Sequence, residues 1–176
     1  MMLFFWDDLS LYLEEFEMAK TLVAYFSATG TTGVAATRLA KVINADIYEI
    51  VPEKPYTNED LDWRDEQSRS SVEMKNPASR PAIGSDKVEN MDSYEKIFLC
   101  FPIWWYKNPT IMNTFLESYD LTGKTIVLFA TSGSTGFGSS VEMLEDSAPR
   151  ARIVEGSMLN GITSDDELKN IAEKFL

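Results

Sequence analysis

Three stretches of the sequence are almost uninterrupted runs of apolar residues, and each leads into a loop of unusual composition. The runs read TLVAYFS (21–27), KIFLCFP (96–102) and KTIVLFAT (124–131). A strand with one face in water alternates apolar and polar residues, whereas a strand covered on both faces does not. The runs therefore predict central strands of a parallel sheet that has helices on both sides.

The segments between and after these runs complete the pattern. Helices are expected over 31–44, 108–119, 139–148 and 164–176, and further strands over 46–52 and 151–159. Ser164 is expected to cap the last helix. Strands that alternate with helices indicate an α/β fold with right-handed crossovers. We expect a three-layer α/β/α sandwich around a five-stranded parallel sheet of order 2-1-3-4-5, with ligands bound beyond the carboxyl ends of its strands.

Two parts of the chain stand outside this pattern. Residues 52–93 are polar and rich in Pro, Ser and Asp, and we interpret them as an insertion between the second and third strands. Residues 1–17 are expected to be an N-terminal appendage that takes no part in the chemistry. They carry five acidic residues and no basic one, which disfavours a secretory signal. Residues 18–176 are therefore expected to form a single domain.

The net charge, the missing histidine and the single cysteine exclude several kinds of partner and catalytic site. The 176 residues carry a formal net charge of -12, which disfavours nucleic acid and an anionic membrane surface as partners. Histidine is missing from the sequence, so Ser-His-Asp and Cys-His catalysis are excluded. The one cysteine, Cys100, cannot form an internal disulfide, and we expect it to be buried in its apolar run. The lone cysteine favours a reducing compartment, so we expect a cytoplasmic protein. No segment approaches the length of a membrane-spanning helix, so we expect no membrane insertion.

The loop after the first apolar run, SATGTTG, has the composition of an anion-binding turn. Ser27, Thr29, Thr31 and Thr32 offer hydroxyl groups, and Gly30 allows the backbone to approach a ligand closely. The N-terminus of the following helix has unpaired N–H groups that can hold a phosphate without a lysine. The alternative is ordinary capping of that helix by Thr31 or Thr32. The Gly-Lys-Ser/Thr ending of nucleoside-triphosphate loops is missing, so a phosphate that serves as an anchor fits better than one that is transferred.

The loops after the other two apolar runs are also unusual. The first, FPIWWYKNP, either stacks on a planar ligand or forms a lid or a partner-binding patch. It has no glycine between Ile103 and Tyr106, so a positive φ there would strain a non-glycine residue. The second, TSGSTGFGSS, is either a plain turn or a rim of exposed backbone N–H groups. A phosphate cradle, an aromatic wall and a polar rim at one end of one sheet fit a flat ring that carries a phosphate, and FMN is the natural cofactor.

The three loops, in this order, resemble those of the flavodoxins, in particular a bacterial flavodoxin-like subfamily with a Pro-Ile-Trp-Trp loop. The resemblance spans roughly residues 19–176 and is carried by TLVAYFSATGTT, DLDWRDEQSRS and FPIWWYKNPTIMNTFLESYDLTGKTIVLFATSGSTGFGSS. It implies that the FMN phosphate is held by Ser27, Thr29, Gly30, Thr31 and Thr32. It implies that the isoalloxazine ring is bordered by Pro102, Ile103, Trp104 and Trp105. The other edge of the ring would contact Thr131, Ser132, Gly133 and Ser134. We assign neither a catalytic side chain nor a metal ligand.

Different functions remain open at this point. An electron-transfer carrier would dock to other redox proteins near the flavin through an acidic rim. An FMN-dependent oxidoreductase would take hydride from NAD(P)H and reduce a quinone-like small molecule, and a third alternative is a flavin-binding interaction module. Residues 58–70 of the insertion would be a docking surface, a substrate lid or a solvated loop, with Trp63 and Arg69 as contacts near the ring. We favour the electron carrier.

Overall fold

The computed structural model describes residues 20–176, and the expected appendage, residues 1–17, lies outside this range. Five strands form one parallel sheet in the order β2-β1-β3-β4-β5, which confirms the predicted topology. The strands are β1 (Thr21–Tyr25), β2 (Asp46–Glu49), β3 (Lys96–Pro102), β4 (Thr125–Thr131) and β5 (Arg152–Met158).

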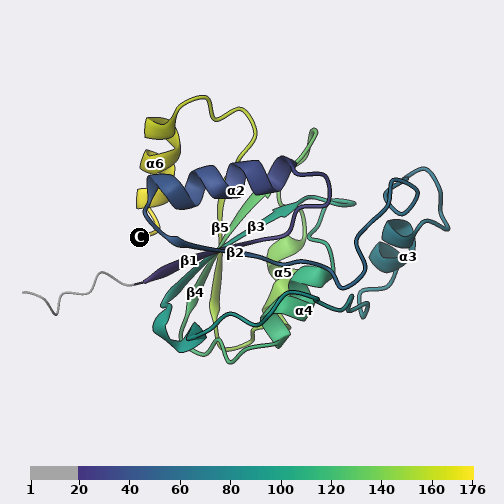
Figure 1. Cartoon of the computed structure of the whole chain (residues 1–176), viewed down its shortest axis with the longest axis horizontal. Coiled ribbons are helices and arrows are strands. Elements are labelled where there is room, and N and C mark those ends of the chain that lie inside the picture. Colours follow the sequence, from purple (N-terminus) through teal and green to yellow (C-terminus); the bar gives the residue numbers. More distant parts are fainter. Residues whose placement is uncertain (1–19) are drawn as a thin grey trace, which may run out of the picture.

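Helices cover both faces of the sheet, as Figure 1 shows. The helices α2 (Thr31–Val42) and α6 (Asp165–Glu173) lie on one face, and α4 (Ile111–Glu117) and α5 (Ser140–Glu145) lie on the other. Successive residues of the strands point to opposite faces of the sheet and belong to two separate hydrophobic cores. Val23, Phe98 and Val127 pack with α2 and α6, whereas Leu22, Leu99 and Leu128 pack with α4 and α5. All six are buried, because both faces of the central strands are covered, and the three-layer prediction is confirmed.

The insertion between β2 and β3 contains the helix α3 (Arg69–Lys75) and the short 3-10 helix η1 (Met91–Ser93). Figure 1 shows α3 apart from the three layers, beyond the end of the sheet at which α2 begins. The two arms that lead to α3 are joined by an antiparallel bridge between Pro52 and Ile83. The insertion is therefore a folded extension of the sheet's carboxyl end and not an unstructured loop.

Several local predictions can be compared with the structure. Ser164 caps α6 as predicted, because its Oγ accepts a hydrogen bond of 3.1 Å from the Glu167 N–H group. Cys100 is completely buried in β3 as predicted, and burial raises the pKa of its thiol. The helix expected over 108–119 begins later, at Ile111. The Asn108 side chain bonds the Pro109 carbonyl and the Asn113 side chain, so this segment forms a buried polar turn before the helix. Within residues 20–176, no helix is long and apolar enough to cross a membrane.

Candidate functional site

A cavity of about 600 Å³ opens at the carboxyl end of the sheet, where the loops after β1, β3 and β4 meet. Ten of the thirteen predicted site residues line it: Thr29, Thr31, Thr32, Pro102, Ile103, Trp104, Trp105, Thr131, Ser132 and Gly133. The other three, Ser27, Gly30 and Ser134, are not part of its wall. Three segments that are far apart in the sequence therefore form one concave surface.

Among the described residues, the first backbone N–H groups of α2, which follow the loop after β1, are not capped by a side chain. Gly30 precedes α2 with a φ of 93°, which favours glycine, and no side chain in the described part of the chain caps the helix. The alternative of capping by Thr31 or Thr32 is therefore wrong. Within residues 20–176, the N–H groups of Thr31, Thr32 and Gly33 have no hydrogen-bond acceptor. Such a helix terminus carries partial positive charge and suits a phosphate.

Ser27 and Ser134 shape the loops instead of facing the cavity. The Ser27 Oγ accepts a hydrogen bond of 3.1 Å from the Gly30 N–H group and so closes the turn before α2. In the loop after β4, the Ser134 N–H group donates to the Ser132 Oγ at 3.3 Å. These residues set the backbone path that the lining residues follow, and the sequence pattern does not distinguish the two roles.

Hydrogen bonds connect the loop SATGTTG (27–33), called the phosphate-type loop from here on, with the end of β4. They also connect the loop after β4 with the segment after β5. The hydroxyl groups of Thr32 and Thr131 lie 2.8 Å apart, and both side chains are buried. The Ser132 N–H group donates to the Asn160 Oδ1 at 2.6 Å. Asn160 follows β5 and also lines the cavity. These contacts link the start of α2, the end of β4 and the segment after β5, although β3 separates β1 from β4 in the sheet.

The aromatic loop after β3 forms a tight turn. Trp104 and Lys107 exchange two backbone hydrogen bonds, of 2.9 and 3.1 Å. The two residues between them, Trp105 and Tyr106, have positive φ values of 46° and 63°. Positive φ at both central positions is the pattern of a type I′ turn, in which glycine or asparagine is preferred. The strain anticipated for a turn without glycine is therefore present here.

The loop after β4 packs against this turn and donates a hydrogen bond to it. The Ser139 N–H group donates to the Tyr106 carbonyl at 3.1 Å. A Cβ atom on Gly138 would lie 1.8 Å from that carbonyl oxygen, and Gly138 has a positive φ of 54°. Glycine is thus required at 138 both for backbone conformation and for the close approach of Tyr106.

Trp104 is held by two further aromatic rings. Its ring centroid lies 5.6 Å from that of Phe26 and 5.5 Å from that of Tyr56, in edge-to-face arrangements. Tyr56 belongs to the insertion and donates its hydroxyl hydrogen to Glu73. Burial is the main cause that raises the pKa of Tyr56, and this hydrogen bond is the second cause. The insertion therefore helps to position the aromatic wall of the cavity.

Of the two ring contacts predicted in the insertion, the structure places one at the cavity. Trp63 lines the wall, although most of its side chain is exposed. Arg69 does not line it. Its guanidinium lies 3.9 Å from the Tyr56 ring centroid and bonds Glu73 at 2.7 Å. Arg69 therefore acts on the cavity through Tyr56.

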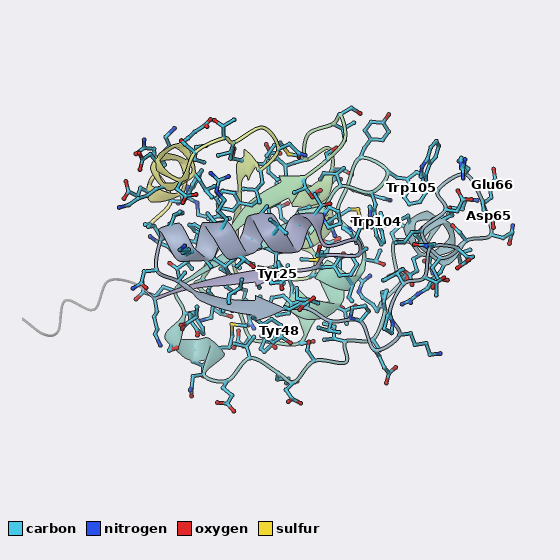
Figure 2. All side chains as sticks on the ribbon, turned by 45° about the horizontal axis from the view of Figure 1, so that its top comes forward. Tyr25, Tyr48, Asp65, Glu66, Trp104 and Trp105 are labelled. Atoms are coloured by element: carbon cyan, nitrogen blue, oxygen red, sulfur yellow. The ribbon has the colours of Figure 1, made fainter. Side chains whose placement is uncertain are left out.

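Four lining residues were not predicted from the sequence: Ala28, Leu61, Ser70 and Asn160. Ala28 could have been predicted, because it lies inside the phosphate-type loop. The other three come from the insertion or from the segment after β5, and their residue types carry no local signal of a site. Figure 2 shows Trp104 and Trp105 at the end of the sheet that faces the insertion, whose outer loop carries Asp65 and Glu66.

All fifteen lining residues have uncharged side chains. They comprise hydroxyl groups, one amide, three tryptophans and small or aliphatic groups. Such a surface can bind a flat, neutral ring by stacking and by neutral hydrogen bonds, while the free N–H groups at the start of α2 hold an anion. The geometry thus favours the binding of a planar molecule with an anionic tail.

Comparison with known proteins agrees with this architecture. A family model described as flavodoxin matches residues 20–175. Curated protein sequences give no match. A candidate flavoprotein from Bacteroides eggerthii is 47% identical, with a TM-score of 0.82 over 89% of this chain and 97% of that one. A similar protein from Bacteroides uniformis is 47% identical, with a TM-score of 0.81 over 88% and 98% of the two chains.

A more distant structure shares the fold. It is a flavoprotein from Lactobacillus acidophilus in complex with FMN, which is 20% identical, with a TM-score of 0.63 over 88% of this chain and 99% of that one. At this identity the likeness concerns the fold alone. The match of the family model to nearly the whole described chain shows that the protein belongs to the flavodoxin family.

Proposed function

We propose that this protein binds FMN and works as an electron-transfer carrier. The observation that carries the proposal is the meeting, in one cavity, of unpaired N–H groups at the start of α2 with the indoles of Trp104 and Trp105. The flavodoxin family match and the FMN complex of the Lactobacillus acidophilus flavoprotein support the choice of FMN as the planar anion.

The residues present fit this cofactor in kind. Thr29, Thr31 and Thr32 would hold the phosphate with hydroxyl and backbone N–H groups, without a lysine. Trp104 and Trp105 would border the ring, and the loop that begins at Thr131 would contact its polar edge. FMN, when bound, supplies the redox chemistry, because its ring accepts and releases electrons. The protein's part is to bind the ring, orient it and exclude water from one face.

The composition of the cavity wall favours a carrier over an oxidoreductase. Its uncharged side chains hold no group that could donate a proton near neutral pH to a quinone as it is reduced. An outer-sphere electron carrier needs a bound ring with an edge close to the surface and no proton-transfer side chain. Trp105, which is 41% exposed, places the aromatic end of the cavity at that surface.

The insertion supports docking of a redox partner near the ring. Its outer loop carries the exposed carboxylates of Glu59, Asp65 and Glu66 beside the exposed Trp63. An acidic rim of this kind attracts a partner with a basic surface and accelerates encounter at low ionic strength. We also propose that residues 18–176 act as one domain, and that the protein works in the cytoplasm.

The carrier and the oxidoreductase predict different kinetics for the FMN-loaded protein. We expect negligible oxidation of NADH or NADPH in the presence of a quinone, above the rate of free FMN at the same concentration. A flavodoxin reductase with a basic docking surface should reduce the bound flavin rapidly, and added salt should slow that reaction. Multiple-turnover quinone reduction by the protein and NAD(P)H alone would favour the oxidoreductase and contradict the carrier.

A further inference from the structure

Ser70 of α3 carries a buried hydroxyl group without a hydrogen-bond partner. The residue is 2% exposed, and within residues 20–176 its Oγ has neither a donor nor an acceptor in reach. It is also one of the residues that line the cavity. A buried hydroxyl that lacks a partner costs stability, and such groups are rare in native structures. The hydroxyl at this position is therefore available to a partner other than residues 20–176, such as a ligand in the cavity.

The surroundings of Ser70 are otherwise fully satisfied. Its N–H group donates to the Asp60 carbonyl at 3.0 Å. The neighbouring hydroxyl groups of Ser68 and Ser71 pair with each other at 2.9 Å, and Ser68 also caps α3. Arg69 and Glu73 form an ion pair of 2.7 Å on the same helix. The local fold is thus well determined, and the lone hydroxyl of Ser70 is the exception within it.

We propose that Ser70 is a cofactor-binding residue whose hydroxyl donates a hydrogen bond to the ring of bound FMN. This inference rests on the proposed function. The hydrogen of a serine hydroxyl rotates about the Cβ–Oγ bond, so it can be directed at an acceptor in the cavity. The carbonyl oxygens and ring nitrogens of isoalloxazine are such acceptors. The insertion then supplies a direct contact to the cofactor in addition to its support of Trp104.

The packing of α3 favours the ring over the phosphate as the partner of Ser70. Arg69 and Glu73, which flank Ser70 on α3, both hold Tyr56, and the Tyr56 ring lies against Trp104. Ser70 is therefore tied to the aromatic part of the site. The phosphate-type loop contributes its own unpaired N–H groups at the start of α2, so the phosphate is provided for without Ser70.

The test compares Ser70→Ala with the matched control Ser71→Ala. Titration of the apoprotein with FMN, followed by quenching of flavin fluorescence, gives Kd for each. Ser70→Ala is expected to weaken FMN binding about 3- to 10-fold, the range of one net hydrogen bond. It is expected to weaken riboflavin binding by the same factor, because riboflavin has the ring without the phosphate. Ser71→Ala should change either Kd less than about 2-fold.

The stability of the two apoprotein variants is expected to rank in the opposite order to their loss of FMN affinity. Ser70→Ala removes a group without a partner and should leave the denaturation midpoint unchanged or raise it, whereas Ser71→Ala removes a paired hydroxyl and should lower it. An unchanged FMN Kd in Ser70→Ala would overturn the inference. A loss of affinity for FMN but not for riboflavin would place the contact at the phosphate and would also overturn it. Absence of FMN binding by the unaltered protein would instead contradict the proposed function itself.

Discussion

Gly138 is the residue on which the shape of the aromatic wall depends most directly. It lies under the turn that presents Trp105, and its missing side chain leaves room for the Tyr106 carbonyl. The turn itself is strained, because Trp105 and Tyr106 both take positive φ. A strained turn persists when its surroundings hold it, and the Ser139 N–H group provides such a contact. The lack of glycine from Ile103 to Tyr106 predicts this strain, but the local sequence does not predict the support from Ser139.

Gly138→Ala is expected to lower the free energy of unfolding by roughly 1–3 kcal/mol, because alanine is strained at this φ and clashes with the Tyr106 carbonyl. FMN affinity should fall as well, since the tryptophan turn must move. Gly136→Ala in the same loop is the control. Its Cβ would meet no atom within 4 Å, so stability should stay the same or rise by up to about 1 kcal/mol. Chemical denaturation and FMN titration check both variants, and equal losses in the two would contradict the account.

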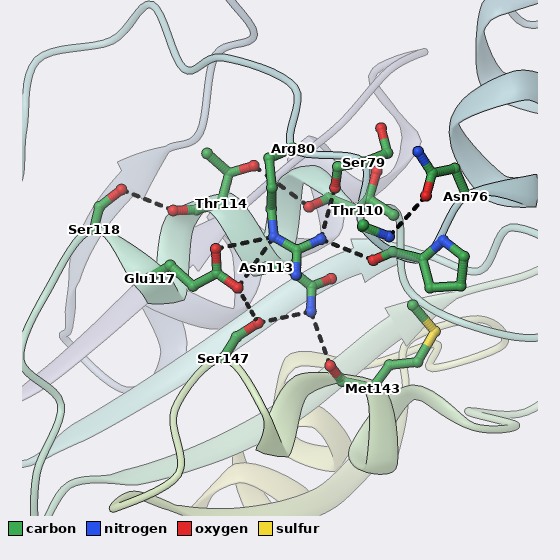
Figure 3. Close-up of polar contacts among 12 residues, drawn as sticks. Asn76, Ser79, Arg80, Thr110, Asn113, Thr114, Glu117, Ser118, Met143 and Ser147 are labelled. Atoms are coloured by element: carbon green, nitrogen blue, oxygen red, sulfur yellow. Dashed lines mark hydrogen bonds and ion pairs between the residues drawn. The ribbon is translucent and has the colours of Figure 1, made fainter.

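At the scale of elements, a polar network joins the insertion to α4 and α5, as Figure 3 shows. The Arg80 guanidinium in the insertion donates from Nε to both carboxylate oxygens of Glu117 on α4, at 3.0 and 2.9 Å. Glu117 also accepts from the Ser147 hydroxyl at 2.8 Å, and the Asn113 amide bonds Ser147 and the Met143 carbonyl. The hydrogen bond from Arg80 is the main cause that lowers the pKa of Glu117.

This lowered pKa predicts a pH-dependent contribution to stability. The ordinary pKa of glutamate is 4.5, so the stabilisation from Glu117 is fully present above that pH. It is lost as the pH falls through the lower pKa of the folded state. Glu117→Gln should therefore cost roughly 0.5–1 kcal/mol at pH 7, because the pair is partly exposed. Urea denaturation at a series of pH values should show the difference from the unaltered protein shrinking below about pH 4.5.

Glu95→Gln is a suitable control for this series, because Glu95 is exposed and its side chain makes no hydrogen bond or ion pair within residues 20–176. Its stability should follow that of the unaltered protein over the same pH range. A constant gap between Glu117→Gln and the unaltered protein from pH 7 to pH 3 would show that the Arg80 pair does not contribute as described.

Element types were predictable where burial alone decides them. The apolar runs at 96–102 and 124–131 mark β3 and β4 because both faces of these strands are covered. Element ends were less predictable, because side chains compete with the backbone there. Asn108 diverts the first expected turn of α4 into a separate polar turn, and this depends on Asn113 being close in space. A local pattern does not contain that information.

At the scale of the whole molecule, the parallel sheet brings three loops to one end. Ten of the thirteen predicted residues line the cavity because the carboxyl ends of parallel strands share an edge. The contribution of the insertion was not predictable in the same way. Leu61 and Ser70 reach the cavity through the folding of a 42-residue polar segment, residues 52–93, whose composition resembles a solvated loop. Long-range packing such as that of Tyr56 against Trp104 decides its course.

The central claim is that the cavity at the carboxyl end of the sheet binds FMN, and the most direct measurement is the absorbance of the purified protein. We predict a yellow protein that releases one equivalent of FMN on denaturation. Its apoprotein should recover the same visible spectrum when FMN is added. The unfolding temperature should rise with added FMN, and above Kd the rise should follow the logarithm of the free FMN concentration. A correctly folded, colourless protein that takes up no added FMN would contradict the account.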